Sequence, residues 1–262
     1  MHDRQLERYS RHILMPEIDL AGQEQLLNSK VMIVGLGGIG SPAAMYLAAS
    51  GIGHLMLNDH DHVDLGNLQR QILHSTIELN MLKTESARER LHSLNPDVHI
   101  DTIERQLTLN ELAEYASHVD VVIDASDNFN CRYTINNACV MTQTPLVWGA
   151  ATGLKGQVTV FKTFEQNPCL NCLYPLQVDQ EQMGSCGESG VLAPLTGIIG
   201  SMMATEALKL LLGLGTSLSG RLLQFDAAKP EWRQSRFTKD PKCGICGLSK
   251  HQITRTDHAE AF

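Results

Sequence analysis

Basic residues are scarce relative to acidic ones in this chain of 262 residues. It contains 21 Lys and Arg against 29 Asp and Glu, which gives a formal net charge of -8. Proteins that bind a nucleic-acid backbone concentrate positive charge on one surface, because they neutralise phosphates. The sequence has no basic stripe of that kind, so we expect partners that are small molecules or proteins and no nucleic acid.

Long apolar runs are also lacking. Residues 1–5 mix charges and no apolar run follows them, so neither a secretory signal nor a transit peptide is evident and we expect a cytoplasmic protein. The most apolar stretch, residues 197–214, contains Glu206 and Lys209 and is short for a bilayer span, which needs roughly 20 apolar residues. We therefore expect a buried helix there and no membrane contact.

Internal repeats, low-complexity segments and linkers that would divide the chain are absent as well. Hydrophobic residues make up 43% of the sequence, which is ample for a continuous core. We expect a single domain over residues 1–262. Within it, helical spacing predicts an N-terminal helical segment at 1–28, polar and glycine-containing sequence predicts a mobile crossover loop at 173–190, and we expect a frayed tail at 247–262.

A strand, a glycine-rich turn and a helix follow one another near the N-terminus. The β-branched run at 31–34 leads directly into a G-x-G-x-x-G turn, whose glycines are Gly35, Gly37, Gly38 and Gly40. Ser41 and Pro42 suit the start of a helix, and Gly51 suits its end. Such a turn lets the backbone approach a phosphate closely, and the N-terminus of the helix offers free N–H groups to an anion.

An acidic residue stands where a ribose-binding carboxylate is expected. The second strand, at 54–58, ends at Asp59, about 20 residues after Gly40, and an acid at this distance takes a ribose hydroxyl in dinucleotide-binding folds. The glycine turn and this acid taken alone favour an NAD(P)-dependent dehydrogenase of the Rossmann type.

The remaining patterns predict an α/β fold. A helix is predicted at 83–94 and apolar strands at 119–123 and 146–148, with two alternating strands at 157–161 and 221–225. We expect a Rossmann-like, doubly wound and mostly parallel sheet with extra antiparallel strands and N-terminal helices; the cysteines described below add a structural zinc site to this fold.

Two cationic residues shift the interpretation from a nicotinamide cofactor to a triphosphate. Arg70, in the segment 67–71, and Lys83 follow closely behind Asp59. No Walker motif, G-x-x-x-x-G-K-[ST], occurs in the chain, so these side chains would take the place of the Walker lysine. The alternative is that both are solvated surface charges.

Carboxylates also follow the strand at 119–123. Asp124 and Asp127 stand at a strand end, where ligands bind in open α/β sheets. They are suitable for Mg²⁺, which takes one or two carboxylates and leaves its other positions to phosphate and water. Local sequence supports helix capping by Asp127 or Asn128 equally well.

Seven cysteines include two Cys-x-x-Cys motifs, Cys169/Cys172 and Cys243/Cys246, about 70 residues apart. In a protein without signs of secretion, such pairs indicate a metal site rather than disulfides. Four thiolates form a closed tetrahedral site for structural Zn²⁺ with no open position for catalysis. The alternative is that the two motifs never meet. The free thiols would be Cys131, Cys139 and Cys186.

Taken together, these residues resemble the MoeB/ThiF group of sulfur-carrier adenylyltransferases, prokaryotic relatives of the ubiquitin-activating enzymes. The resemblance runs over almost the whole chain. The motifs that carry it are Arg8 to Leu14, Gly35 to Gly40, Asn67 to Gln71, Lys83, Asp124 to Asn128, both cysteine pairs and Gly190 to Leu195.

The resemblance implies that ATP activates the C-terminal glycine carboxylate of a small ubiquitin-like sulfur carrier ending in Gly-Gly, giving an acyl-adenylate and pyrophosphate. By the same likeness, Asp59 holds the ribose, Asn67, Arg70 and Lys83 hold the phosphates, and Asp127 holds Mg²⁺. A terminal carboxylate is already an anion at neutral pH and needs no general base. Its obstacle is repulsion from the triphosphate, so catalysis should come from cations and alignment.

Family likeness also concerns two residues that pattern alone does not assign. An arginine matching Arg11 reaches the ATP of the neighbouring subunit, which implies a working homodimer; its plain alternative is a helix-surface charge. Some relatives use a cysteine in the loop of Cys186 to link covalently to the carrier, and others dispense with it. The chain ends soon after Cys246 with no rhodanese-like domain, so we expect a separate sulfur donor.

The favoured pathway is molybdopterin (molybdenum cofactor) biosynthesis, with the thiamine-pathway carrier as the alternative substrate of the same chemistry. Two hypotheses of other classes remain: an NAD(P)-dependent oxidoreductase, and a non-catalytic scaffold that retains nucleotide and zinc. The first gives no reason for Arg70 and Lys83. The second predicts ATP binding without pyrophosphate exchange.

Overall fold

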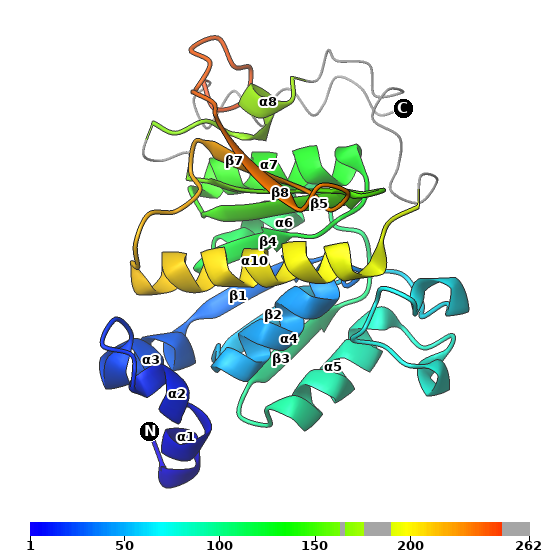
Figure 1. Ribbon diagram of the computed structural model, residues 1–262, viewed down its shortest axis with the longest axis vertical. Helices are drawn as coiled ribbons and strands as arrows, with labels where there is room; N and C mark the ends of the chain where they lie inside the picture. The colour runs from blue at the N-terminus through cyan, green and yellow to red at the C-terminus, as the bar shows by residue number, and fades with distance from the viewer. Residues whose placement is uncertain (163–165, 176–189, 248–262) are drawn as a thin grey trace.

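The computed structural model describes residues 1–162, 166–175 and 190–247 (Figure 1). Its centre is an eight-stranded sheet with the strand order β3-β2-β1-β4-β5-β6-β7-β8. The strands are β1 Lys30–Val34, β2 His54–Asn58, β3 His99–Ile103, β4 Val121–Asp124, β5 Leu146–Thr152, β6 Lys155–Phe161, β7 Arg221–Asp226 and β8 Glu231–Arg236.

The first five strands are parallel. β1 lies between β2 and β4, with Val34 opposite Asn58 on one side and Asp124 on the other. Chain order therefore reverses between β1 and β4, and ligands of open α/β sheets bind outside the carboxyl ends of strands at such a point. The remaining pairings, from β5 through β8, are antiparallel. The expected mostly parallel sheet with extra antiparallel strands is confirmed.

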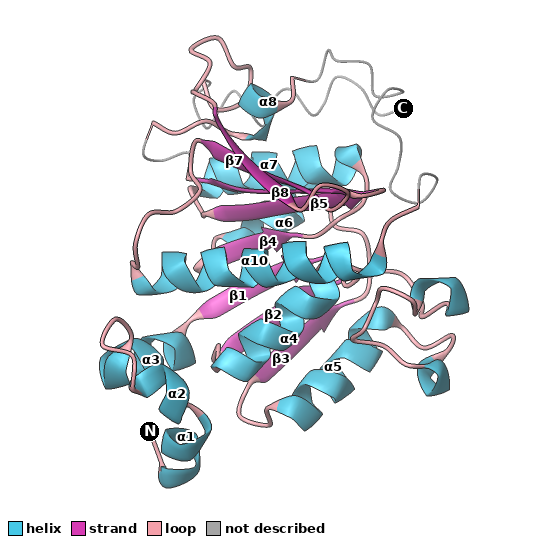
Figure 2. Cartoon of the chain, in the orientation of Figure 1, coloured by secondary structure: helices cyan, strands magenta, loops and turns pink. Residues whose placement is uncertain are grey.

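Helices cover both faces of the sheet. Figure 2 shows α4, α5 and α10 in front of it and α6 and α7 behind it. The described helices are α1 Asp3–Arg8, α2 Ser10–Ile13, α3 Asp19–Asn28, α4 Gly40–Ser50, α5 Lys83–Leu94, α6 Leu109–Ala116, α7 Phe129–Thr142, α8 Leu170–Leu173 and α10 Ala193–Leu212, with short 3₁₀ turns η1 Leu65–Asn67 and η2 Thr76–Glu78.

The hydrophobic core has two halves, one on each face of the sheet. Successive side chains of a strand point to opposite faces, and β1 shows this directly. Val31 and Ile33 pack with residues of α4, α5 and α10. Met32 and Val34 pack with residues of α6 and α7. Because all four residues of 31–34 are buried, the strand reads as a continuous apolar run, as expected for a parallel strand covered on both sides.

The N-terminal helices pack beside the main sheet, as the sequence predicts. Tyr9 is 3% exposed, and its hydroxyl accepts a hydrogen bond of 2.9 Å from Asn95 Nδ2. Gly51 ends α4 with φ +87°, and a Cβ there would lie 2.6 Å from the Tyr9 ring. The N-terminal segment therefore closes over the end of α4 and depends on glycine at that position.

The apolar stretch near residue 200 forms α10, which is a core helix. It is long and apolar enough to cross a membrane by length and composition, but half of its apolar window is buried inside the protein. It packs against α4, β5 and β6 (Figure 1). Glu206 is buried, pairs with Lys209 and accepts a hydrogen bond from the Leu218 amide. The expectation of a buried helix is confirmed, with the helix starting at Ala193.

One predicted helix start was wrong. Ser41 does not cap α4; its hydroxyl instead donates to the Leu36 carbonyl at 3.3 Å, and the residue before the helix is Ile39. The helix begins at Gly40, where the tight glycine turn packs the backbone of Gly40 directly against that of Gly35. A Cβ on Gly40 would lie 1.9 Å from the Gly35 carbonyl oxygen.

Candidate active site

The glycine turn is built for close backbone approach. Gly35 directly follows β1 and has φ +93°, and a Cβ on it would lie 2.7 Å from the Ala125 carbonyl oxygen. The ends of β1 and β4 therefore touch through backbone alone. Gly37 and Gly38 come next and line a pocket at this edge of the sheet. Gly40 lies outside the lining and serves packing.

Most of the predicted nucleotide-binding residues meet in this pocket, although they come from separate segments. Asp59 follows β2, Arg70 follows η1, Lys83 begins α5 and Asp127 follows β4. The wall consists of Val34, Gly35, Gly37, Gly38, Ile39, Asn58, Asp59, His60, Asp61, Arg70, Gln71, Lys83, Gln106, Leu107, Leu112, Ala125, Ser126, Asp127, Asn128, Asn130, Cys131, Arg132, Thr134, Ala151, Val191 and Thr196.

Asp59 fixes the glycine turn from the side of β2. It is 9% exposed, and its Oδ2 accepts from the Leu36 amide at 2.7 Å while Oδ1 accepts from the Asp61 amide at 2.9 Å. Each carboxylate oxygen carries lone pairs beyond those used here. The residue predicted to hold the ribose thus also ties two turns together.

Lys83 is buried at the first turn of α5 and forms an ion pair with Asp61. The distance from Lys83 Nζ to Asp61 Oδ2 is 2.9 Å. Burial alone would raise the pKa of Asp61, but the hydrogen bond and charge of Lys83 outweigh it and hold that pKa below its usual value. Asp61 was missed in the sequence; its signal was its place two residues after Asp59, at the end of the same strand.

Arg70 is positioned by its own turn. Its guanidinium donates to Asn67 Oδ1 at 3.0 Å and to the Gly66 carbonyl at 3.3 Å. Asn67 does not line the pocket of the described chain, and its observed partner is Arg70. Two of the three residues predicted to hold phosphate, Asn67 and Arg70, are therefore hydrogen-bonded to each other.

The polar residues at the end of β4 and in the turn after it have different surroundings. Asp124 is fully buried, and its Oδ1 accepts from the amide and hydroxyl of Ser126 at 3.0 and 2.6 Å. Burial raises the pKa of Asp124. Asn128 caps α7 by accepting from the Cys131 amide at 2.8 Å. Asp127 remains exposed and faces the pocket, so it is the carboxylate of this turn that is available to a cation.

Two further polar side chains of the pocket wall were not predicted. Arg132 is 4% exposed, donates to the Ser126 carbonyl at 2.9 Å and lies over the rings of Phe129 and Trp148. Gln71 is 4% exposed, and its Oε1 has no hydrogen-bond partner among the described residues. A buried amide oxygen without a partner costs free energy, and a ligand hydroxyl or amine in the pocket would satisfy it.

His74 links the glycine turn to the helix that carries Lys83. It is 7% exposed; its Nε2 lies 3.1 Å from the Leu36 carbonyl and its Nδ1 lies 2.7 Å from Ser86 Oγ on α5. Since a carbonyl oxygen can only accept, Nε2 carries the proton and Nδ1 accepts from Ser86. Burial lowers the pKa of His74, which favours this neutral form. No sequence motif marked this residue.

The remaining residues singled out from the sequence are one arginine and three cysteines. Arg11 is exposed on α2 and does not line the described pocket. Cys186 lies outside the described residues. Cys139 is buried, and Cys131 borders the pocket with its pKa raised to about 12 because its thiol is buried. The last two are therefore thiols and not thiolates at neutral pH, as expected for idle cysteines.

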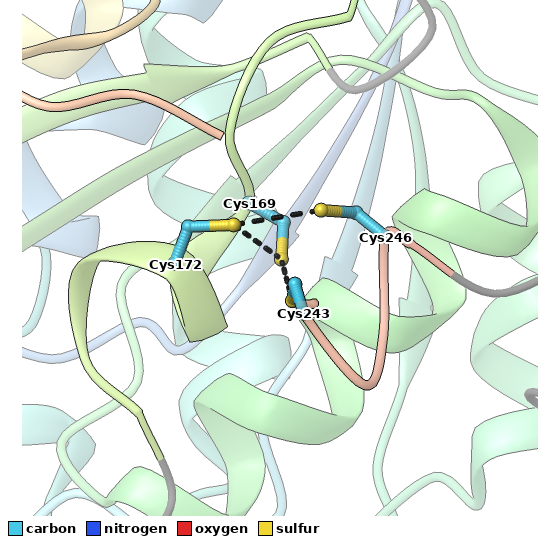
Figure 3. A group of neighbouring side chains, drawn as sticks. All are labelled: Cys169, Cys172, Cys243 and Cys246. Carbon is cyan, nitrogen blue, oxygen red and sulfur yellow. Dashed lines mark hydrogen bonds between the residues drawn. The ribbon is translucent and has the colours of Figure 1, made fainter. Parts of the chain in front are cut away.

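The two Cys-x-x-Cys motifs do meet. Figure 3 shows Cys169 and Cys172, at α8, facing Cys243 and Cys246 of the C-terminal segment. The Sγ–Sγ distances are 4.0 Å for Cys169–Cys172, 3.7 Å for Cys169–Cys243 and 3.5 Å for Cys172–Cys246. Tetrahedral zinc with Zn–S bonds of about 2.3 Å requires sulfurs about 3.8 Å apart. The four side chains thus fit Zn²⁺.

One backbone group outside the cluster contacts a sulfur: the Asp240 amide donates to Cys172 Sγ at 3.5 Å. Hydrogen bonding among the four thiols lowers the pKa of Cys172 to about 6 and also lowers that of Cys243, whereas it raises the pKa of Cys169 and Cys246. The Leu170 amide at the start of α8 is held by Asn136 Oδ1 on α7, at 2.9 Å. The cluster therefore joins the C-terminal segment to the helix layer behind the sheet.

Comparison with protein-family models identifies the family of this chain. The ThiF family model matches residues 9–245. The chain belongs to the ThiF family. The resemblance expected from the sequence motifs is thereby confirmed, and so is the Rossmann-like architecture around the glycine turn.

Named relatives of this ThiF-family chain fall into two groups. Adenylyltransferase and sulfurtransferase MOCS3 of Drosophila virilis is 43% identical over 94% of this chain and 55% of its own length. Sulfur carrier protein ThiS adenylyltransferase of Escherichia coli is 42% identical over 95% of this chain and 98% of its own length. The chain thus spans about half the length of the Drosophila relative and nearly all of the bacterial one.

Solved structures share the fold. E. coli MccB with ATP superposes with a TM-score of 0.77 at 22% identity, covering 86% of this ThiF-family chain and 69% of MccB. PaaA gives a TM-score of 0.76 at 24% identity over 92% of this chain and 76% of PaaA. At such identities the likeness concerns the fold.

Proposed function

We propose that this protein uses ATP to adenylate the C-terminal glycine carboxylate of a ubiquitin-like sulfur-carrier protein, as a single adenylation domain. The observation that carries the proposal is the joint placement of Arg70 and Lys83 in the pocket beside the glycine turn and Asp59. A nicotinamide cofactor has no triphosphate for two cations to bind. Both named groups of relatives are called adenylyltransferases, which supports the same chemistry.

The reaction follows from the charges in the pocket. A carboxylate oxygen of the carrier attacks the α-phosphorus of ATP, the bond from that phosphorus to the bridging oxygen of the β-phosphate breaks, and pyrophosphate leaves with the bonding electrons. The nucleophile and the triphosphate are both anions, so their approach is opposed by repulsion. Arg70 and Lys83 reduce that repulsion and align the phosphates in a site partly screened from water.

Other residues hold the nucleotide. Asp59 would accept from a ribose hydroxyl, and the unpartnered Gln71 Oε1 offers a further acceptor. The exposed Asp127 would hold Mg²⁺, which is supported by its position in the pocket wall together with Asp61. Mg²⁺, when bound, would neutralise phosphate charge. The four cysteines would hold a structural Zn²⁺ away from this chemistry.

We further propose that the working unit is a homodimer in which Arg11 reaches the ATP of the neighbouring subunit. The support is that Arg11 is exposed and does not line the described pocket of its own chain. Immediately after α2, Leu14 is 72% and Met15 44% exposed. Apolar side chains next to an exposed arginine are suited to a protein interface.

The carrier and its pathway form the finer part of the proposal. Molybdopterin synthesis is one branch, supported by the MOCS3 relatives. Thiamine synthesis is the second, supported by a ThiS adenylyltransferase that the chain matches over 98% of its length. In either case a cytoplasmic enzyme with a separate sulfur donor is expected, and Cys186, outside the described residues, is the candidate for a covalent link to the carrier.

ATP–pyrophosphate exchange with purified protein tests the proposal, with the molybdopterin and thiamine carriers assayed separately. Exchange that depends on one carrier supports adenylation and names the branch. Arg70→Ala and Lys83→Ala should each lower exchange at least about 100-fold, whereas Arg88→Ala, in a surface pair on α5, should not. ATP binding without exchange with either carrier would favour the scaffold hypothesis, and full activity in both pocket variants would overturn the phosphate assignment.

A further inference from the structure

A cluster of two histidines and one aspartate lies at the opposite end of the strands from the nucleotide pocket. His54 is the first residue of β2 and His99 is the first residue of β3. Asp59, by contrast, follows the last residue of β2. Five residue steps from His54 to Asp59 span about 17 Å, so the cluster is separate from the proposed catalytic chemistry.

Strand register brings these side chains together. His54 and His99 are direct partners in the parallel β2–β3 ladder, and Met56 is paired with Asp101. Partner residues share a face of the sheet, and so do residues two apart in one strand. His54, His99 and Asp101 therefore project from one face at one corner of the sheet, on adjacent strands whose pairing fixes their spacing.

The imidazole nitrogens and the carboxylate oxygens of these three residues lie close together. Asp101 Oδ2 lies 2.8 Å from His54 Nε2, and Asp101 Oδ1 lies 3.2 Å from His99 Nε2. The two imidazole centroids are 4.6 Å apart. One possible metal-ligand atom from each of the three residues lies within 4.8 Å of the other two. The side chain of His54 is 21% exposed, whereas those of Asp101 and His99 are 51% and 67% exposed, so the cluster is open to solvent.

We propose that His54, His99 and Asp101 form a binding site for a divalent transition-metal ion such as Zn²⁺, separate from the cysteine cluster. Two imidazole nitrogens and one carboxylate oxygen are ligands that borderline-soft first-row cations accept. Without a metal, Nε2–H of His54 donates to Asp101 Oδ2; an ion takes the place of that proton, and in neutral imidazole the remaining proton sits on Nδ1, which leaves the Nε2 lone pair for the metal. Small side-chain rotations then place three ligands around one ion, with its remaining positions toward water.

The site would join an edge strand to its neighbour. β3 is at the end of the sheet and pairs only with β2 in the described chain. A metal held by His54 on one strand and His99 on the other links residues 45 positions apart in the sequence. Because an ion that binds the folded chain in preference to the unfolded chain stabilises it, Zn²⁺ should raise the unfolding temperature through this site.

Zinc stoichiometry tests the proposal on the full chain with the cysteine cluster already filled by one Zn²⁺. Equilibrium dialysis against buffered Zn²⁺, without nucleotide, should then show a further equivalent in the wild type. His99→Ala and Asp101→Asn should each weaken this binding at least about 10-fold. His118→Ala, which changes an exposed histidine outside the cluster, should leave it unchanged. Co²⁺ bound in place of this Zn²⁺ should give visible absorption without sulfur-to-metal charge transfer.

A second control addresses the nucleotide pocket, where Asp59, His60 and Asp61 form another group of possible ligands. His60→Ala should retain the additional zinc. Retention of the same affinity and stoichiometry in His99→Ala would overturn the proposal, as would the absence of any zinc beyond the cysteine-bound equivalent in the wild type. His99 is largely exposed, so its substitution should not disturb folding, and circular dichroism provides the check.

Discussion

Lys83 and Asp61 form a 2.9 Å ion pair between a side chain that is 5% exposed and one that is 57% exposed. The ammonium is thus removed from water on all sides except the pocket, and Asp61 is the partner that stabilises its charge there. Asp61 therefore supplies a countercharge to the buried Lys83 and fixes the direction of its Nζ.

Asp61→Asn should weaken ATP use without unfolding the protein. Lys83 loses the charge that orients it, so we expect the KM for ATP in pyrophosphate exchange to rise about 10-fold, which corresponds to about 1.4 kcal/mol. Steady-state exchange at varied ATP measures this. Glu114→Gln, an exposed carboxylate on α6, is the matched control. An unchanged KM in Asp61→Asn would show that Lys83 is positioned by other groups.

His74 should make stability depend on pH. Its pKa is lowered in the folded protein by burial, whereas it is about 6.5 in the unfolded chain. The unfolded chain therefore binds a proton first as the pH falls, and the stability present above about pH 6.5 is lost toward the folded pKa. We expect the free energy of unfolding to fall by at most about 1.4 kcal/mol per pH unit from this residue.

Urea unfolding between about pH 5 and 8 checks this expectation. His74→Gln should show a shallower loss of stability on acidification than the wild type, because the group that takes up the proton is absent. His118→Gln should follow the wild-type profile, since His118 is exposed. Parallel profiles for wild type and His74→Gln would contradict a depressed pKa at this site.

Cys169→Ser should release zinc and lower stability. A hydroxyl is a poor replacement for thiolate in a four-sulfur site, and the segment carrying Cys243 loses its attachment to α8. We expect loss of the cysteine-bound equivalent of zinc and a loss of stability of several kcal/mol, on the order of 3. Metal analysis and thermal unfolding measure the two effects. Cys131→Ser, outside the cluster, should keep its zinc; a stable, zinc-replete Cys169→Ser protein would refute the proposed site.

Mixing two inactive variants tests whether Arg11 acts across a dimer. Arg11→Ala and Lys83→Ala should each be inactive alone. In a mixed dimer, one site combines an intact Lys83 with the intact Arg11 of the other subunit, so co-unfolded and refolded mixtures should regain about one quarter of wild-type exchange. Absence of recovery, with mixed dimers shown to be present by mass spectrometry of tagged chains, would place Arg11 outside the neighbouring site.

Short-range patterns allowed much of the site to be predicted from the sequence. The glycine turn and the helix from Lys83 to Leu94 are local signals, and the observed α5 has the predicted bounds. The cysteine motifs predicted a cluster because the chemistry of four thiolates is specific. Asp127 and Asn128 were indistinguishable locally. Only geometry shows that Asn128 caps α7 while Asp127 faces the pocket.

The remaining features depend on contacts between distant segments. His74 joins Leu36 to Ser86, and Gln71 is recognised only by its lack of a partner. The edge strands β3 and β8 were also missed. Four of the five residues of β3 are exposed or half-buried, and all six residues of β8 are exposed. Neither has the apolar alternation by which a strand is recognised.

In the described part of the chain, the polar strands β3 and β8 form the two edges of the sheet. A sheet edge offers unpaired N–H and C=O groups on which another chain can add, which is a route to aggregation. β3 ends the sheet with His99 and Asp101 near its start, and β8 ends it with Glu231, Arg233 and Arg236. Charged side chains at an edge disfavour the addition of a foreign strand. The same polar sequences that made these strands hard to predict thus also disfavour the addition of further strands to the open sheet by aggregation.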